Sequence, residues 1–475
     1  MTRYLLHNLR IVTGDSDFPG SIAVEGDRIC DVWKKDNDGM AVSGSRALPF
    51  DELPRYFQTE MPRSEVTDFH GLTALAGGVD AHVHFREPGM PHKGDIGSES
   101  LSAMLGGVTS YIDMPNTNPP TISAARLSEK LGAAEGRSWA NYGFHIGATN
   151  TNLSEIESML EKHEDGIGAR DFGGIKIFMG SSTGNMLVDD NDALSAFFRI
   201  KDKEILIHSE DESIIKANMA KASSRYGDDI PFQVHKDIRS RQACIRSTAK
   251  ALELAMRYGT RLHVLHVSTK EEIEMIRAAK QYNPEITAET SANYLWFCSD
   301  DYERLGSHLK CNPSVKDAED RAALREALKT GLIDTAGSDH APHLADEKAR
   351  KYMSAPSGLP SIRQTLPVLL TVAAEEDIPL SRIASVFSEK TADMFGIRDR
   401  GHIKPGCKAD IVIVDPAAEH VVTANEYGYR CGWTPYEGVR LNGMVKAVYI
   451  NGCMCVSDGK ATGVQPQGQR LTFDR

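Results

Sequence analysis

The sequence predicts an α/β fold, a (β/α)8 TIM barrel with a small β-sandwich domain built from both terminal segments. Between about residues 73 and 390, short apolar segments alternate with amphipathic stretches, which is the pattern of a barrel. Before and after this region the pattern is that of β-strands alone. The length of 475 residues suits a barrel of roughly 250–300 residues plus a second domain.

Eight short apolar segments are expected to form the parallel strands of the barrel. They lie near 73–84, 108–114, 142–148, 173–179, 204–209, 261–267, 285–291 and 333–339. Helical patterns separate them, for example at 123–136 and 268–282. In such a barrel the side chains that do chemistry lie at the carboxyl ends of the strands.

The same pattern predicts three consecutive parts of the chain. Residues 1–72 form the N-terminal part of the β-sandwich domain, 73–395 the barrel, and 396–475 the C-terminal part of the sandwich. Residues 35–67 are mixed and charged with little periodicity, so we expect an exposed insertion or a long loop there.

Composition excludes several classes of protein. A formal net charge of −12 argues against a nucleic-acid-binding surface. No run of 18 apolar residues occurs, so no membrane partner is expected. The eight cysteines are scattered without CxxC pairs and predict reduced thiols. We expect a cytoplasmic homo-oligomer, either a dimer or a tetramer, that acts on a small molecule.

The end of the first expected strand carries a His-x-His pair. Residues two apart on a strand face the same way, so His82 and His84 lie side by side while their neighbours pack on the other face. Two adjacent imidazoles suit Zn or a similar metal. A lone histidine would more often be an ordinary core or surface residue.

Four more strands place polar residues at matching positions. Lys176 alternates with isoleucines, so it points into the barrel, where a charged amine is costly. It either pairs with a carboxylate, or has a lowered pKa and captures CO2 as a carbamate. His208, His266 and Asp339 end the fifth, sixth and eighth strands. Together these residues predict a metal site.

One motif resembles a known signature. Residues 80–89, Asp-Ala-His-Val-His-Phe-Arg-Glu-Pro-Gly, are similar to the dihydroorotase signature of the amidohydrolase superfamily. Further matches are Met114–Pro120, Gly-Ile-Lys-Ile-Phe around Lys176, Lys310–Pro313 and Ser338–His343. The resemblance covers about residues 70–400.

The resemblance implies reversible hydrolysis of (S)-dihydroorotate to N-carbamoyl-L-aspartate in de novo pyrimidine biosynthesis. It implies two divalent metal ions, expected to be Zn, held by His82, His84, carbamylated Lys176, His208, His266 and Asp339. It makes Asp339 the catalytic residue that moves a proton. It also implies that Arg86, Asn116, Asn312, His343 and the backbone near Gly358 hold the substrate.

The sequence also allows other interpretations of single residues and of the function. The planar fork of Arg86 suits a substrate carboxylate, but the residue could instead form a surface salt bridge. Asn116 could be a simple turn residue. The function could be that of an allantoinase or of a hydantoinase or dihydropyrimidinase, whose substrates lack the ring carboxylate. A non-catalytic assembly partner is also possible, although all six ligand positions hold competent residues.

Overall fold

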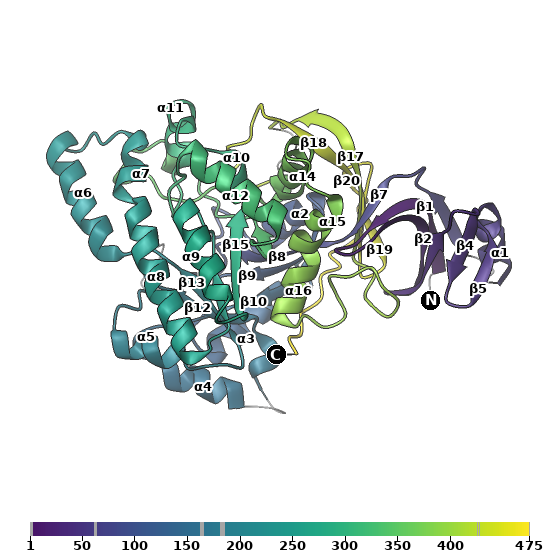
Figure 1. The fold of residues 1–475 in the computed structure, drawn as a ribbon, viewed down its shortest axis with the longest axis horizontal. Coiled ribbons are helices and arrows are strands. Elements are labelled where there is room, and N and C mark those ends of the chain that lie inside the picture. The colour runs from purple at the N-terminus through teal and green to yellow at the C-terminus, as the bar shows by residue number, and fades with distance from the viewer. Residues whose placement is uncertain are drawn as a thin grey trace.

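The structure is a computed structural model that describes residues 3–60, 64–161, 166–180, 186–424, 426 and 428–474. A helix-covered barrel occupies one end of the molecule, and a sheet of strands β1 to β5 with helix α1 lies at the other (Figure 1). None of the helices in these ranges combines the length and apolarity needed to cross a membrane.

The barrel consists of parallel strands in two hydrogen-bonded groups, ordered β10-β9-β8 and β11-β12-β13-β14-β15-β16. The strands are β8 (Gly78–Val83), β9 (Val108–Asp113), β10 (Asn141–Phe144), β11 (Ile146–Gly147), β12 (Gly174–Phe178), β13 (Glu204–His208), β14 (Leu262–Val264), β15 (Ile286–Ser291) and β16 (Thr335–Gly337). A parallel bridge between Val83 and His340 brings the last strand beside the first. The predicted α/β barrel is confirmed.

Helices follow the strands along the chain. They are α2 (Ile96–Leu105), α3 (Ala124–Ala134), α4 (Leu153–Glu161), α5 (Asn191–Phe197), α6 (Glu212–Tyr226), α7 (His235–Ile238), α8 (Arg241–Tyr258), α9 (Lys270–Lys280), α10 (Ala292–Trp296), α11 (Asp301–Leu305), α12 (Ala318–Thr330), α13 (Ala345–Lys348), α14 (Thr365–Glu375), α15 (Leu380–Ala384) and α16 (Lys390–Phe395). The helices predicted at 123–136 and 268–282 are α3 and α9. Ser123 and Thr269 cap them by accepting hydrogen bonds from backbone N–H groups.

The expected first strand at 73–84 is two strands in different sheets. Residues Thr73–Ala76 form β7, which pairs with β1 and β17, and β8 begins after Gly77. A Cβ atom on Gly77 would lie 2.2 Å from Oγ1 of Thr109, so only glycine fits where the chain changes sheets. Both halves are apolar, so the sequence pattern predicted them as a single strand.

The terminal segments form one mixed sheet of 11 strands. Its strands are β1 (Arg3–Val12), β2 (Asp17–Glu25), β3 (Arg28–Lys35), β4 (Met40–Ser43), β5 (Arg46–Pro49), β6 (Glu65–Asp68), β7, β17 (Ile411–Val421), β18 (Arg440–Ile450), β19 (Cys453–Ser457) and β20 (Lys460–Ala461). The prediction of a β-domain from both termini is confirmed. The prediction of a long loop at 35–67 is wrong, because this segment holds β4, β5, α1 (Leu53–Glu60) and β6. A cluster that includes Trp33 and Phe57 buries the inner face of α1.

The last residues of the chain return to the barrel. The backbone of Tyr142 on β10 is hydrogen-bonded to Gln469 and Leu471. Leu471 and Phe473 are buried in a cluster with Val79 and other residues of the strands. The carboxyl-terminal segment therefore covers the amino-terminal end of the barrel, opposite the strand ends that carry the predicted site.

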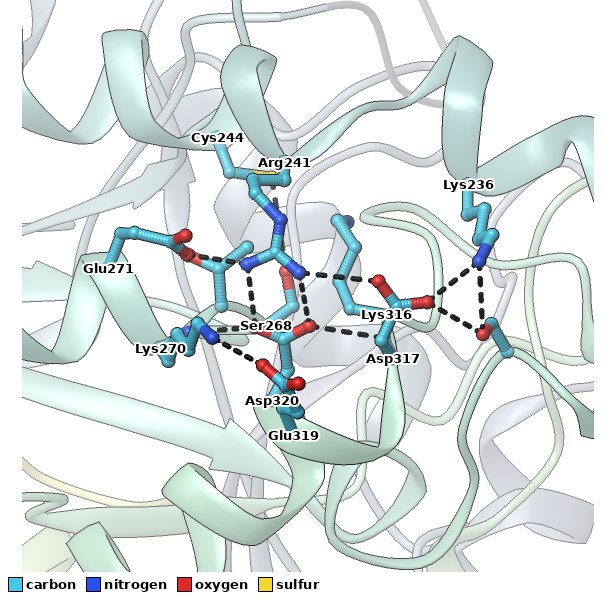
Figure 2. A network of polar contacts seen from close by, with 12 residues as sticks. Lys236, Arg241, Cys244, Ser268, Lys270, Glu271, Lys316, Asp317, Glu319 and Asp320 are labelled. Carbon is cyan, nitrogen blue, oxygen red and sulfur yellow. Dashed lines mark hydrogen bonds and ion pairs between the residues drawn. The ribbon is translucent and has the colours of Figure 1, made fainter.

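A network of charges ties α8, α9 and the start of α12 together (Figure 2). Arg241 donates to Asp320 through Nη1 at 2.9 Å and through Nη2 at 2.7 Å, and to Glu271 at 2.6 Å. Asp320 is only 1% exposed, so its charge depends on this bidentate partner. Lys270 and Glu319 form a separate pair at the exposed edge.

Replacing Arg241 with Met should destabilise the protein, because it leaves the buried carboxylate of Asp320 without its charged donor. We expect a loss of about 1–3 kcal/mol, measured as a lower thermal midpoint. The matched control is Lys270→Met, which removes an exposed pair and should leave the midpoint unchanged. Equal midpoints for the two variants would contradict this role of Arg241.

Candidate active site

A cavity lies at the carboxyl ends of the barrel strands, where the chemistry of such barrels is located. All six predicted metal ligands and four of the predicted substrate residues line it. The lining residues are His82, His84, Arg86, Asn116, Lys176, Phe178, His208, His266, Cys311, Asn312, Asp339, Ala341, Ser357 and Gly358. Residues from nearly the whole barrel therefore meet here.

His82, His84 and Asp339 form a cluster suited to a cation. His82 donates from Nδ1 to Glu289 at 2.6 Å, and His84 donates from Nδ1 to Asn116 at 2.8 Å. Nε2 of each ring faces Oδ1 of Asp339, and both distances are 3.3 Å. Burial acts to lower the pKa of His82, but Glu289 and Asp339 outweigh it and the pKa is raised. A proton on His82 or a cation bound among the three groups therefore supplies the positive charge that the cluster needs.

Electrostatics favours a metal over a proton at His84. Burial lowers the pKa of His84 to about 4, although Asp339 acts in the opposite direction. Burial also acts to raise the pKa of Asp339, but His82 and His84 outweigh it and the pKa is lowered. At neutral pH His84 therefore presents a neutral imidazole nitrogen beside the ionised carboxylate of Asp339, and both groups are ordinary ligands of divalent metals.

His208 and His266 form a second group of nitrogen donors beside the first. His208 donates from Nε2 to Glu210 at 2.9 Å, and its Nδ1 faces Nε2 of His266 at 2.9 Å. The ring of His266 lies 5.2 Å from that of His82, measured between centroids. Burial lowers the pKa of both His208 and His266, so both rings are neutral donors.

Lys176 points into the cavity from the middle of β12 and is 1% exposed. Among the described residues its amine has no hydrogen bond or ion pair and lies only over the ring of Phe178. Burial lowers its pKa to about 7, against the opposing effects of Asp339 and Glu289. The prediction of an inward-facing lysine is confirmed, and no described carboxylate forms the ion pair that was the alternative.

Three cavity residues have a left-handed backbone. The φ angles are 67° at Arg86, 39° at His266 and 48° at Asp339. Each lies just beyond its strand, and β14 and β16 end earlier than predicted. This conformation costs roughly 1–2 kcal/mol for a residue with a side chain. The surrounding structure thus holds the backbone in a strained conformation that turns these three side chains into the cavity.

Arg86 and His343 differ in their access to the cavity. Arg86 lines it and is 2% exposed, and within the described part of the chain it forms no ion pair. Burial lowers its pKa to about 10, so it keeps its charge at neutral pH. His343, predicted to hold the substrate, lies behind Arg86, with its Nε2 3.0 Å from Nη2 of the arginine.

The remaining substrate residues are placed as follows. Oδ1 of Asn312 is buried with no hydrogen-bond partner among the described residues, so it can accept from a bound molecule. Gly358 lines the cavity, but its N–H donates to the carbonyl of Lys310 at 2.9 Å. Its carbonyl accepts from Lys348 at 3.1 Å. Help from the Gly358 backbone is therefore limited by these internal bonds.

Sequence reasoning missed the carboxylates that orient the histidines. Glu289 is 1% exposed on β15 and bonds His82, and Glu210 is fully buried and bonds His208. Such partners fix which ring nitrogen faces the cavity. Glu289 lies on the opposite face of β15 from Ile286 and Ala288, so strand parity gives a signal for it, although a weaker one than for Lys176 because most of β15 is polar.

Comparison with known proteins agrees with this geometry. The model of the amidohydrolase family matches residues 73–455. The chain belongs to the amidohydrolase family. Among its amidohydrolase relatives, the dihydroorotase of Methanosarcina acetivorans is 33% identical over 91% of this chain and 88% of that protein. The allantoinase of Rubrobacter xylanophilus is 29% identical over 86% of this chain and 90% of that protein.

Solved amidohydrolase structures have the same architecture. The L-hydantoinase (dihydropyrimidinase) of Arthrobacter aurescens superposes with a TM-score of 0.87 at 27% identity, covering 99% of this chain and 100% of that one. Family membership and the donor set together identify this amidohydrolase as a metal-dependent cyclic amide hydrolase acting on a small molecule.

Replacing Glu289 with Gln should weaken divalent metal binding by about 10–100-fold, because His82 loses the charged acceptor that orients it. Titration of the metal-free protein with Zn²⁺ measures the affinity directly. Glu272→Gln is the matched control, since Glu272 is also buried but bonds Thr248 and Thr269 instead of a site histidine. Unchanged affinity in Glu289→Gln would contradict the orienting role.

Proposed function

We propose that this amidohydrolase is a dihydroorotase, which opens (S)-dihydroorotate to N-carbamoyl-L-aspartate and can close the ring again. The observation that carries the proposal is Arg86, a buried cation on the cavity wall without an ion pair among the described residues. An unpaired buried charge is costly, so a ligand that brings an anion to it is favoured. Dihydroorotate carries a carboxylate on its ring.

Three polar groups suit the rest of such a ring. Arg86 offers a planar fork to the carboxylate, and Asn116 lines the same cavity. Oδ1 of Asn312 can accept from a ring N–H, because it is buried with no partner among the described residues. These contacts would hold the ring with its amide toward the histidine cluster.

We propose that the metal ions are two, with Zn as the expected metal. Their ligands would be His82, His84, Lys176 as a CO2-derived carbamate, His208, His266 and Asp339. Lys176 supports this assignment, because a buried amine without an ion pair becomes an anionic oxygen donor once it captures CO2. When bound, the ions lower the pKa of a water molecule and polarise the amide carbonyl.

Asp339 is placed to move the proton. Its carboxylate lines the cavity and its lowered pKa keeps it ionised at neutral pH. It accepts a proton from the water whose oxygen bonds to the ring carbonyl carbon. It then donates that proton to the ring nitrogen as the carbon–nitrogen bond breaks, which leaves a ureido group and a carboxylic acid that loses its remaining proton to solvent at neutral pH.

The competing function is that of an allantoinase or a hydantoinase. Relatives with these names are about as long as this chain, and the L-hydantoinase structure superposes over nearly all of it. Their substrates lack the ring carboxylate, so Arg86 would have no anion to bind. Assays with dihydroorotate, allantoin and dihydrouracil side by side distinguish the two proposals.

Wild-type enzyme should prefer dihydroorotate to dihydrouracil, its analogue without the carboxylate, by at least about 10–100-fold in kcat/KM. This factor corresponds to one charge-assisted hydrogen bond of roughly 1.5–3 kcal/mol. Arg86→Met should remove most of the preference while the metal content stays normal.

Arg382→Met is the control for this substitution, because Arg382 is half-buried and donates to backbone carbonyls outside the cavity. It should leave the preference intact. Comparable turnover of dihydroorotate and dihydrouracil by the wild-type enzyme would reject the dihydroorotase proposal and favour a hydantoinase.

A further inference from the structure

One wall of the cavity is held from behind by buried side chains. The wall is the 352–358 segment, of which Ser357 and Gly358 reach the cavity. The carbonyl oxygens of residues 352, 355, 356, 357 and 358 all accept hydrogen bonds from three buried side chains outside the segment. The donors are Lys310, His343 and Lys348.

Lys348 lies at the end of α13 and is 0% exposed. Its ammonium donates to the carbonyls of Lys310 at 3.0 Å, Pro356 at 3.0 Å and Gly358 at 3.1 Å. A lysine has three donors, so these bonds use its full capacity. Within the described ranges it forms no ion pair, and burial lowers its pKa to about 7. The three carbonyl dipoles stabilise the charged form.

Lys310 holds the start of the same segment. Its ammonium donates to the carbonyls of Tyr352 and Ala355, both at 2.6 Å, and lies 4.2 Å from the ring centroid of Tyr352. Its own carbonyl accepts from Lys348 and from the N–H of Gly358. The segment Lys310–Pro313, which includes Asn312, is thus hydrogen-bonded to the 352–358 segment.

His343 completes the set, and two of its three polar contacts fit one tautomer. Lys93 can only donate, and its Nζ lies 3.1 Å from Nδ1 of His343. With Nδ1 as acceptor, Nε2 carries the hydrogen and donates to the carbonyl of Ser357 at 3.0 Å. Nη2 of Arg86, which can also only donate, lies 3.0 Å from the same Nε2, so the arginine is in contact with this side of the ring.

These bonds tie the negative ends of five peptide dipoles, including those of the lining residues Ser357 and Gly358, to side chains that do not line the cavity. We propose that Lys348, assisted by Lys310, is a positioning residue that makes this wall selective for an anionic substrate. Carbonyls released into the cavity would repel a carboxylate beside Arg86 but would tolerate a neutral ring. This inference rests on the proposed function, because it takes the ligand of Arg86 to be the substrate carboxylate.

Lys348→Met tests the proposal, since it keeps the length of the side chain and removes all three donors. We expect kcat/KM for dihydroorotate to fall by about tenfold or more, mainly through KM. The value for dihydrouracil should change much less, and metal content should not change. In the substrate-free enzyme, amide hydrogens of the 352–358 segment should exchange faster.

Lys310→Met removes two bonds to the same segment and should shift both measurements in the same direction. It replaces Lys348→Met if that variant does not fold. Lys203→Met is the matched control: Lys203 is also 0% exposed and donates to the carbonyl of Phe172 at 2.9 Å, but it precedes β13 at the opposite end of the barrel. Lys203→Met should lower the stability of the protein without changing the ratio of kcat/KM for dihydroorotate to kcat/KM for dihydrouracil.

An unchanged ratio of the two kcat/KM values in the lysine variants would overturn the proposal, whatever the exchange rates. Failure of the proposed function gives a different result, in which the wild-type enzyme itself does not prefer dihydroorotate. Hydrogen exchange then still tests the positioning role of the two lysines. Faster exchange of the 352–358 amides in both lysine variants supports this role, and unchanged exchange rejects it.

Discussion

Imidazole lone pairs and a carboxylate charge meet at the carboxyl ends of the barrel strands. The rest of the site depends on how this cluster is stabilised. Nε2 atoms of His82 and His84 both face the same oxygen of Asp339 at 3.3 Å, so this cluster needs a positive charge, which a proton or a cation can supply. Divalent metals satisfy such a cluster, and metal dependence is a property of the family. The strained backbone at His266 and Asp339 and the buried carboxylates behind the rings follow from the same requirement.

The cavity has two halves of opposite electrostatic character. On one side, Glu289 and Glu210 orient the histidines and favour cations. On the other, Arg86 and Lys348 are buried without ion pairs among the described residues, which favours an anion. The substrate that we propose, a cyclic amide with a carboxylate, would match both halves at once, with its amide at the histidine side and its charge at the arginine side.

The sequence predicted the parts of this site that obey a periodic rule. Strand parity and the location of chemistry in barrels identified His82, His84, Lys176, His208, His266 and Asp339 as cavity residues. The division of 73–84 at Gly77 was missed because both halves are apolar. His343 was predicted to hold the substrate, but the structure places it behind Arg86. The contacts of His343 and Lys348 could not be predicted, because loops far apart in sequence create them. The strands and helix within 35–67 carry too little periodicity to be recognised.

We propose that Lys176 carries a carbamate that binds metal together with the strand-end ligands. A crystal structure of the Zn-loaded enzyme, with anomalous scattering at the zinc edge, tests this proposal. We expect two anomalous peaks in the cavity and density for a carboxylate group on Nζ of Lys176. A bare lysine amine beside bound metal, or metal peaks away from His82, His84 and Asp339, would contradict it.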